Sequence, residues 1–215
     1  MKIIEIKAYT FQELPKKIQE KLIEAEQDYR INDYDFPWQN ENQEPLKVFC
    51  NLFNITWKNY EYWPGVDINY KINLYDEVLK LTGPRLAAYL WNNHKQDLYK
   101  AKIRYKRQYT PEGKYTGSKI YRSNLFLANR CTLTGYCLDD DFLEPIYKFF
   151  ETQSNKVDLE ELYQECLYSG LKAMNKDCEY FISPEACKEH LEEIAQLYTM
   201  QGDLINQLQG DPTNQ

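Results

Sequence analysis

Apolar and polar residues recur along the chain with two different periods, one typical of strands and one of helices. Residues 2–9, K-I-I-E-I-K-A-Y, alternate and predict a short strand. Residues 11–29 then carry apolar side chains every three or four positions, which predicts an amphipathic helix. Thr10 is placed to cap this helix, and Glu13 completes a capping box.

An aperiodic stretch of polar and aromatic residues follows at 30–45, so we expect a loop there. Its aromatic side chains, Tyr34, Phe36 and Trp38, are candidates for contacts with a partner. A short helix is predicted at residues 48–52.

The next segments predict a β-hairpin and an interrupted helix. Residues 55–63 look extended and residues 66–72 alternate strictly, so they should pair as antiparallel strands with one buried face. Pro64 and Gly65 between them fit the centre of a type II turn. A helix is expected over 75–94, split or kinked at Gly83-Pro84.

A second hairpin is predicted from K-A-K-I-R-Y-K-R-Q-Y, residues 100–109. Ile103 and Tyr105 would face one side and the cationic residues the other, with P-E-G-K as the turn and K-I-Y-R-S-N as the returning strand. A continuing helix over 95–107 is the alternative, because short segments of this kind are ambiguous.

Three helical stretches are expected between residues 139 and 208, with breaks near 153–155 and 182–184. Ser183 before Pro184 is a typical helix start. Together these elements predict one α+β domain over residues 1–208: a sheet-bearing part, 1–130, and C-terminal helices, 139–208. The antiparallel sheet would contain two hairpins plus the N-terminal strand, packed with helices and a C-terminal helical segment. Residues 209–215 are expected to be a disordered tail.

Charge is distributed unevenly along the chain. The whole chain has a formal net charge of -7, and aromatic residues make up 15% of it. Residues 95–130 hold ten Lys and Arg against two acids, a net +8, whereas the remainder holds 16 basic and 31 acidic residues, a net -15. A basic island therefore lies within an acidic protein, which argues against simple nonspecific coating of nucleic acid.

The N-terminal sequence and the apolar runs indicate a cytoplasmic protein. M-K-I-I-E-I-K has no signal-peptide pattern, and no run approaches the length of a membrane span, so no membrane partner is expected. In that compartment the six cysteines should be reduced thiols.

The segment C-T-L-T-G-Y-C-L-D-D-D, residues 131–141, holds cysteines and carboxylates but does not fit the spacing of zinc or calcium sites. Five residues separate Cys131 from Cys137, more than zinc sites use, and an EF-hand starting at Asp139 would put Glu144 and Phe150 where Gly and Glu are required. We interpret it as a turn at 134–135 followed by a helix capped by one of the three aspartates.

A second cluster, Cys178, Cys187 and His190, lacks an evident fourth ligand. The chain has two histidines and no phosphate-binding glycine motif, so no nucleophilic triad or nucleotide site can be assembled. The sequence predicts no catalytic residue, metal or cofactor, and favours a noncatalytic binding protein.

The basic, tyrosine-rich island is the strongest candidate for a binding surface. Its cationic side chains could contact RNA or DNA phosphates, or an acidic patch on a protein. The alternative is a solvated strand face, and the acidic remainder could itself occupy a nucleic-acid groove of another protein. The candidate residues are Lys100, Lys102, Arg104, Lys106 and Arg107.

Two motifs resemble a family of small bacteriophage and mobile-element proteins labelled antitoxins of toxin-antitoxin stability systems. The opening Y-T-F-Q-E-L-P-K-K-I-Q-E-K-L-I, residues 9–23, resembles the family's Y-x-F-x-E-L start, and D-C-E-Y-F-I-S-P-E-A, residues 177–186, is similar to its E-Y-x-x-S-x-E-A segment. The middle departs from the family, since N-Y-E-Y-W-P-G-V stands in place of a glycine-rich aromatic stretch.

The resemblance implies a mobile-element origin and a noncatalytic binding role. Small acidic, aromatic proteins of such elements often look like inhibitors of host defence, including anti-CRISPR proteins. The expected partner is a CRISPR effector nuclease or its guide-RNA complex. The alternative is an antitoxin that neutralises a cognate toxin, and a more distant one is a nucleic-acid-acting enzyme or metal-binding regulator.

Overall fold

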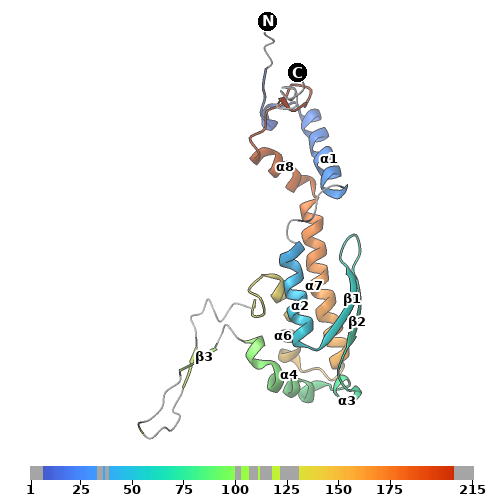
Figure 1. Cartoon of the computed structure of the whole chain (residues 1–215), viewed down its shortest axis with the longest axis vertical. Helices are drawn as coiled ribbons and strands as arrows, with labels where there is room; N and C mark the ends of the chain where they lie inside the picture. Colours follow the sequence, from blue (N-terminus) through green and yellow to red (C-terminus); the bar gives the residue numbers. More distant parts are fainter. Residues whose placement is uncertain are drawn as a thin grey trace, which may run out of the picture. The chain divides into compact units, whose positions relative to one another are not determined.

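The computed structural model describes residues 7–32, 36, 39–99, 103–106, 111, 118–121 and 131–205 (Figure 1). The chain divides into two compact units. Unit 1 contains Met1–Phe36 and Asp177–Gln215, and unit 2 contains Pro37–Lys176. Unit 1 is thus built from both ends of the chain and unit 2 from its middle. The single domain over 1–208 stays a prediction, and the tail at 209–215 lies outside the described residues.

Unit 1 is formed by short helical elements around a small core. They are the 3-10 helix η1 (Phe11–Glu13), α1 (Lys16–Asn32), the end of α7 (Leu159–Phe181) and α8 (Pro184–Glu193). The buried core residues are Phe11, Leu14, Leu191 and Tyr198. Of the predicted strand at 2–9, only residues 7–9 are described, and Tyr9 makes an isolated antiparallel bridge with Tyr198.

The predicted capping box is present, but it closes η1 and not the long helix. The Glu13 carboxylate accepts hydrogen bonds from the Thr10 backbone N–H, at 2.8 Å, and from the Thr10 hydroxyl, at 2.9 Å. These bonds lower the pKa of Glu13. The prediction of one helix over 11–29 is wrong at its start, because Pro15 has no N–H to continue the first turn and α1 begins at Lys16.

Side chains of α1 hold the C-terminal end of α7 within unit 1. Gln27 donates to the Ile182 carbonyl at 2.8 Å, and the buried Arg30 donates to the Phe181 carbonyl at 2.6 Å. The Arg30 guanidinium also lies 4.5 Å from the centre of the Phe181 ring and 2.8 Å from the Glu26 carboxylate. The last carbonyls of a helix carry partial negative charge, so a cationic donor stabilises this end.

Unit 2 begins with a longer helix than the sequence predicts. The segment 39–47, predicted to be mostly loop, belongs to α2 (Gln39–Leu52), which includes Pro45. Leu46, Phe49, Cys50 and Phe53 are buried at helical spacing, and packing of this face offsets the hydrogen bond that Pro45 cannot donate.

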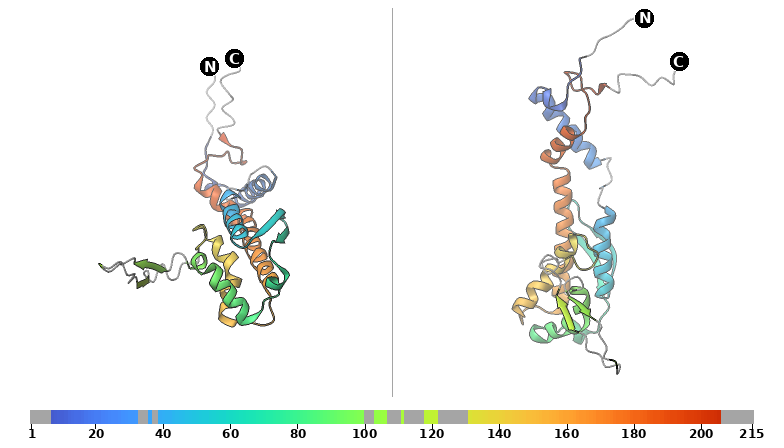
Figure 2. Two further views of the ribbon diagram at one scale, coloured as in Figure 1. Left: turned by 60° about the horizontal axis from the view of Figure 1, so that its bottom comes forward. Right: turned by 90° about the vertical axis from the view of Figure 1, so that its left-hand side faces the viewer.

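The hairpin of β1 (Ile55–Glu61) and β2 (Asp67–Ile72) confirms the prediction of an antiparallel pair. Ile55 lies opposite Ile72 and Glu61 opposite Asp67, with a register shift between Trp57 and Asn59. The hairpin lies beside α7 and α2 in each view (Figure 2). The type II turn is wrong: Gly65 lacks the positive φ that this turn requires, and the Trp63–Pro64 peptide bond is cis.

The predicted break at Gly83-Pro84 separates α3 (Asp76–Leu79) from α4 (Gly83–Leu98). Gly83 adopts φ +55°, and a Cβ there would collide with the Asn155 side chain. Its N–H donates to the Ser154 carbonyl at 3.2 Å. Glycine is required here by both its backbone conformation and the close approach of residues 154–155.

The core of unit 2 surrounds α7. Buried residues recur along α7 every three or four positions from Leu159 to Met174. Phe49 of α2 stacks on Phe142 of α6 (Leu138–Thr152) at 5.4 Å and meets the Tyr163 ring of α7 at 6.4 Å. Gly170 of α7 allows the Phe142 ring to approach its backbone, since a Cβ would lie 2.3 Å from that ring. The three helices therefore interlock through aromatic rings.

A second antiparallel ladder joins β3 (Ile103–Lys106) to β4 (Ser118–Tyr121). This confirms strands in both predicted segments, while the helical alternative is correct only up to Leu98. The predicted turn at 111–114 lies outside the described residues except for Pro111.

The chain is mixed helix and strand, as predicted, but the strands of the described residues form two separate two-stranded sheets. The prediction of one sheet that contains both hairpins is therefore wrong for the described strands, and residues 2–6 of the predicted N-terminal strand lie outside the described residues. The three C-terminal helices α6, α7 and α8 have the predicted breaks, and the Ser183 hydroxyl accepts from the Ala186 N–H at 3.2 Å.

Candidate functional site

The predicted cationic residues are only partly placed by the structure. Arg104 and Lys106 occupy alternate positions of β3, opposite Ile120 and Ser118 of β4. Residues two apart in a strand lie on the same face of a sheet, so positions 104 and 106 lie on one face of this ribbon. The other three candidates, Lys100, Lys102 and Arg107, lie outside the described residues.

The predicted aromatic loop is shorter than expected. Phe36 is half-buried and packs edge-on against Phe181 within unit 1, with ring centres 5.5 Å apart. It therefore contributes to holding the end of α7. Tyr34 and Trp38 lie outside the described residues.

An aromatic cluster on α4 and α6 was missed by the sequence analysis. The ring of Trp91, which is 43% exposed, lies 5.5 Å from that of Tyr99 and 6.3 Å from that of Phe150. The Tyr147 ring packs against that of Tyr99, with ring centres 5.9 Å apart. The Tyr147 hydroxyl donates to the Leu98 carbonyl at 2.7 Å. The spacing of Trp91, Lys95 and Tyr99, four residues apart, was the available signal.

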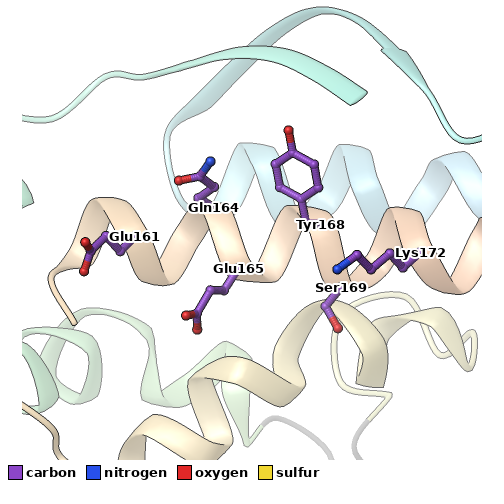
Figure 3. Close-up of a pocket in the computed structure, with 6 residues that line it drawn as sticks. All are labelled: Glu161, Gln164, Glu165, Tyr168, Ser169 and Lys172. Carbon is purple, nitrogen blue, oxygen red and sulfur yellow. The ribbon is translucent and has the colours of Figure 1, made fainter. Parts of the chain in front are cut away.

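An open groove of about 680 Å³ follows one side of α7 (Figure 3). Tyr168 and Gln164 point to one flank of the helix, and Glu165 and Ser169 to the other (Figure 3). A smaller neighbouring cavity of about 290 Å³ shares Glu165 and Ser169 and extends toward α6. Carboxylates, an amide and hydroxyls can hydrogen-bond a polar ligand, but no imidazole lies beside Ser169 in either lining to activate it as a nucleophile.

The two histidines lie in different units. His94 is buried in unit 2 with its ring 4.7 Å from that of Phe53, and burial lowers its pKa. His190 belongs to α8 in unit 1, with its Nε2 3.7 Å from the Glu26 carboxylate. Neither histidine has a serine or cysteine among these neighbours, so the described contacts form no nucleophile–base pair.

All six cysteines are free thiols and form no disulfide. Burial raises the pKa of Cys131 and that of Cys178 each to about 11, which keeps these thiols protonated at neutral pH. Within the described residues no three His, Cys, Asp or Glu side chains are grouped to hold a metal ion.

Asp139 has a structural role that differs from the predicted helix cap. It is fully buried and accepts hydrogen bonds from the backbone N–H groups of Leu133, Thr134 and Gly135, at 2.7 to 3.0 Å, and from the Thr134 hydroxyl at 2.7 Å. Cys137 holds the cap position. The carboxylate thus closes the preceding turn, because three aligned N–H groups satisfy it better than the helix end alone.

Comparisons with known proteins found no matching family model, no similar curated protein and no similar solved structure. Among the helices that the structure describes, none combines the length and apolar character needed to cross a membrane.

Proposed function

We propose that this chain is a noncatalytic binding protein of a phage or mobile element that inhibits a host defence nuclease. It would bind the CRISPR effector or its guide-RNA complex and block it, acting as an anti-CRISPR protein in the bacterial cytoplasm. The resemblance of residues 9–23 and 177–186 to mobile-element proteins supports the origin. The partner class rests on composition and charge.

The β3–β4 ribbon is the observation that carries the proposal. Arg104 and Lys106 occupy alternate ladder positions inside a segment of net charge +8, while the rest of the chain is net -15. A two-stranded ribbon with cations on one face can follow a phosphate backbone or an acidic protein surface. The acidic remainder would repel bare nucleic acid elsewhere and so orient the encounter.

Recovery of partners from the native host tests this proposal. Tagged protein is expressed there, and the proteins and RNA that co-purify are identified by mass spectrometry and sequencing. A CRISPR effector with its guide RNA is the expected result, and added protein should stop target cleavage by that purified effector. A small toxin encoded alongside would instead identify an antitoxin, and the absence of any protein partner would exclude both functions.

Charge reversal on the ribbon tests the proposed surface. Changing Lys102, Arg104 and Lys106 together to Glu should weaken binding to the recovered partner by roughly ten-fold or more, because charge-assisted contacts contribute about 1.5–3 kcal/mol each. The control reverses Lys58 and Lys71, which are exposed on the β1–β2 hairpin. If both variants bind the recovered partner with the affinity of the parent protein, the ribbon is a solvated face and not the binding surface.

A further inference from the structure

Unit 2 presents an aromatic surface on α4 and α6, here called the Trp91 platform and formed by Trp91, Lys95, Tyr99 and Phe150. We propose that the Trp91 platform stacks an unpaired base of single-stranded RNA. This goes beyond nuclease inhibition, because a bare RNA strand is a ligand that the platform would bind without a protein partner.

The rings of the platform are held in place before any ligand arrives. Trp91 meets Phe150 with ring planes 90° apart and meets Tyr99 at 58°. Tyr147, which is buried, fixes this end of α4 by donating to the Leu98 carbonyl. Trp91 still exposes 43% of its surface, a large value for a ring with two aromatic neighbours. An exposed, supported indole is suited to stacking, because little side-chain freedom is lost on binding.

The charge beside the rings is suited to a polyanion. Lys95 lies one helical turn from Trp91 on the same face of α4 and is exposed. The acidic residue of the last turn of α4, Asp97, lies three positions after His94, and its charge opposes the lowering of the His94 pKa by burial. The sequence that continues from this helix to residue 130 has the net charge of +8. Aromatic rings next to cations are the combination that binds single strands without sequence readout.

Single-stranded RNA is favoured over a duplex because its unpaired bases have free faces that can leave the strand and stack. A protein partner with an apolar patch would also contact the rings. It would not gain from the positive charge of Lys95 and the following segment unless it were acidic.

The same unit contains a matched control surface. Trp63, on the turn of the β1–β2 hairpin, is 40% exposed, nearly the same as Trp91. The strand residues next to this turn are acidic, since Glu61 is the last residue of β1 and Asp67 is the first of β2. Lys58 of β1 is exposed, as Lys95 is. Trp63 and Lys58 therefore match the indole and the amine of the platform, but without the cationic setting.

The test is a fluorescence-anisotropy titration of a labelled 20-nucleotide oligo-U RNA with the full chain at low salt. Trp91→Ala should weaken binding about 5- to 100-fold, the range for loss of one base–aromatic stack, and Trp91→Phe should restore most of it. Trp63→Ala should leave the affinity within two-fold. Lys95→Glu should weaken binding and Lys58→Glu should not, and affinity should fall as salt rises.

Three outcomes would overturn the inference: no binding of the RNA by the parent chain, equal affinity of the Trp91→Ala and Trp63→Ala variants, or tighter binding of a duplex of the same length. Circular dichroism of each variant verifies folding, and Trp91→Phe and Lys95→Glu keep the test valid if Trp91→Ala unfolds. Because the RNA is bare, failure here leaves the recovery of a nuclease from the host unaffected.

Discussion

Units 1 and 2 are stabilised in different ways. Unit 2 buries a large cluster of aliphatic and aromatic side chains around α7, including the stacked rings of Phe49 and Phe142. The core cluster of unit 1 contains four buried residues, and unit 1 relies more on polar contacts, above all those of Gln27 and Arg30 with carbonyls at the end of α7. Apolar burial is the dominant stabilising effect in water, so unit 2 should be the more stable of the two.

This difference teaches where each unit tolerates change. In unit 2 the most destabilising change is the replacement of a large buried side chain by a smaller one, because the close-packed rings around it cannot move to fill the cavity. In unit 1 the loss of a donor is as serious, because the partly buried Phe181 carbonyl and Glu26 carboxylate would lose the cation they share.

Truncation of a central ring gives the largest expected effect. Phe49→Ala should destabilise unit 2 by about 3–5 kcal/mol, since Phe49 is fully buried among Phe53, Phe142 and Tyr163. Hydrogen exchange followed by mass spectrometry should show faster exchange along residues 159–174 of α7. Phe11→Ala in unit 1 is the matched change and should speed exchange in residues 16–32 and 184–193. Faster hydrogen exchange in both units of the Phe11→Ala variant would mean that the two units unfold together.

Removal of the clamp on α7 gives an intermediate effect. Arg30→Met keeps most of the apolar stem but removes both charge-assisted hydrogen bonds, so unit 1 should lose about 1–3 kcal/mol. The measurement is hydrogen exchange in residues 16–32 and at the end of α7. Arg85→Met, at an exposed position of α4, is the control and should change nothing. If Arg30→Met also changes nothing, unit 1 is held by its small apolar core alone.

The smallest expected effect is a pH dependence of the free energy of unfolding of unit 2. Burial lowers the pKa of His94 below its ordinary value of 6.5, so the unfolded chain takes up a proton at this residue more readily than the folded one. The stabilisation is complete above about pH 6.5 and is lost as the pH falls toward the folded pKa. Urea unfolding at several pH values measures it, and His94→Gln should flatten that part of the profile. An unchanged profile would show that His94 does not contribute.

Local signals in the sequence predicted the parts of the fold that local chemistry determines. The breaks at Gly83-Pro84 and Ser183-Pro184 follow from residues that interrupt a helix, and the β1–β2 hairpin follows from strict alternation. The start of α2 was missed because its polar first turns have no clear period. Tertiary packing decides such a segment.

The candidate sites show the same limit. The alternation in the basic island predicted the strands that carry Arg104 and Lys106. The spacing of Trp91, Lys95 and Tyr99 could have indicated part of the Trp91 platform. The contribution of Phe150 could not be predicted, because it joins Trp91 through the packing of α6 on α4 and lies 59 positions further along the chain. One of the three aspartates at 139–141 was expected to cap a helix, but only the fold of the preceding turn shows that the Asp139 carboxylate is enclosed by three N–H groups.

The division of unit 1 between the two ends of the chain has a consequence for biosynthesis. Residues 37–176 of unit 2 are contiguous and can fold as soon as they leave the ribosome. Residues 7–32 are made before unit 2, whereas their partners in α8 and at Tyr198 are made after it. The apolar face of α1 therefore stays uncovered while residues 37–176 are being synthesised. Synthesis therefore leaves this part of unit 1 exposed to proteases and chaperones while unit 2 is being made.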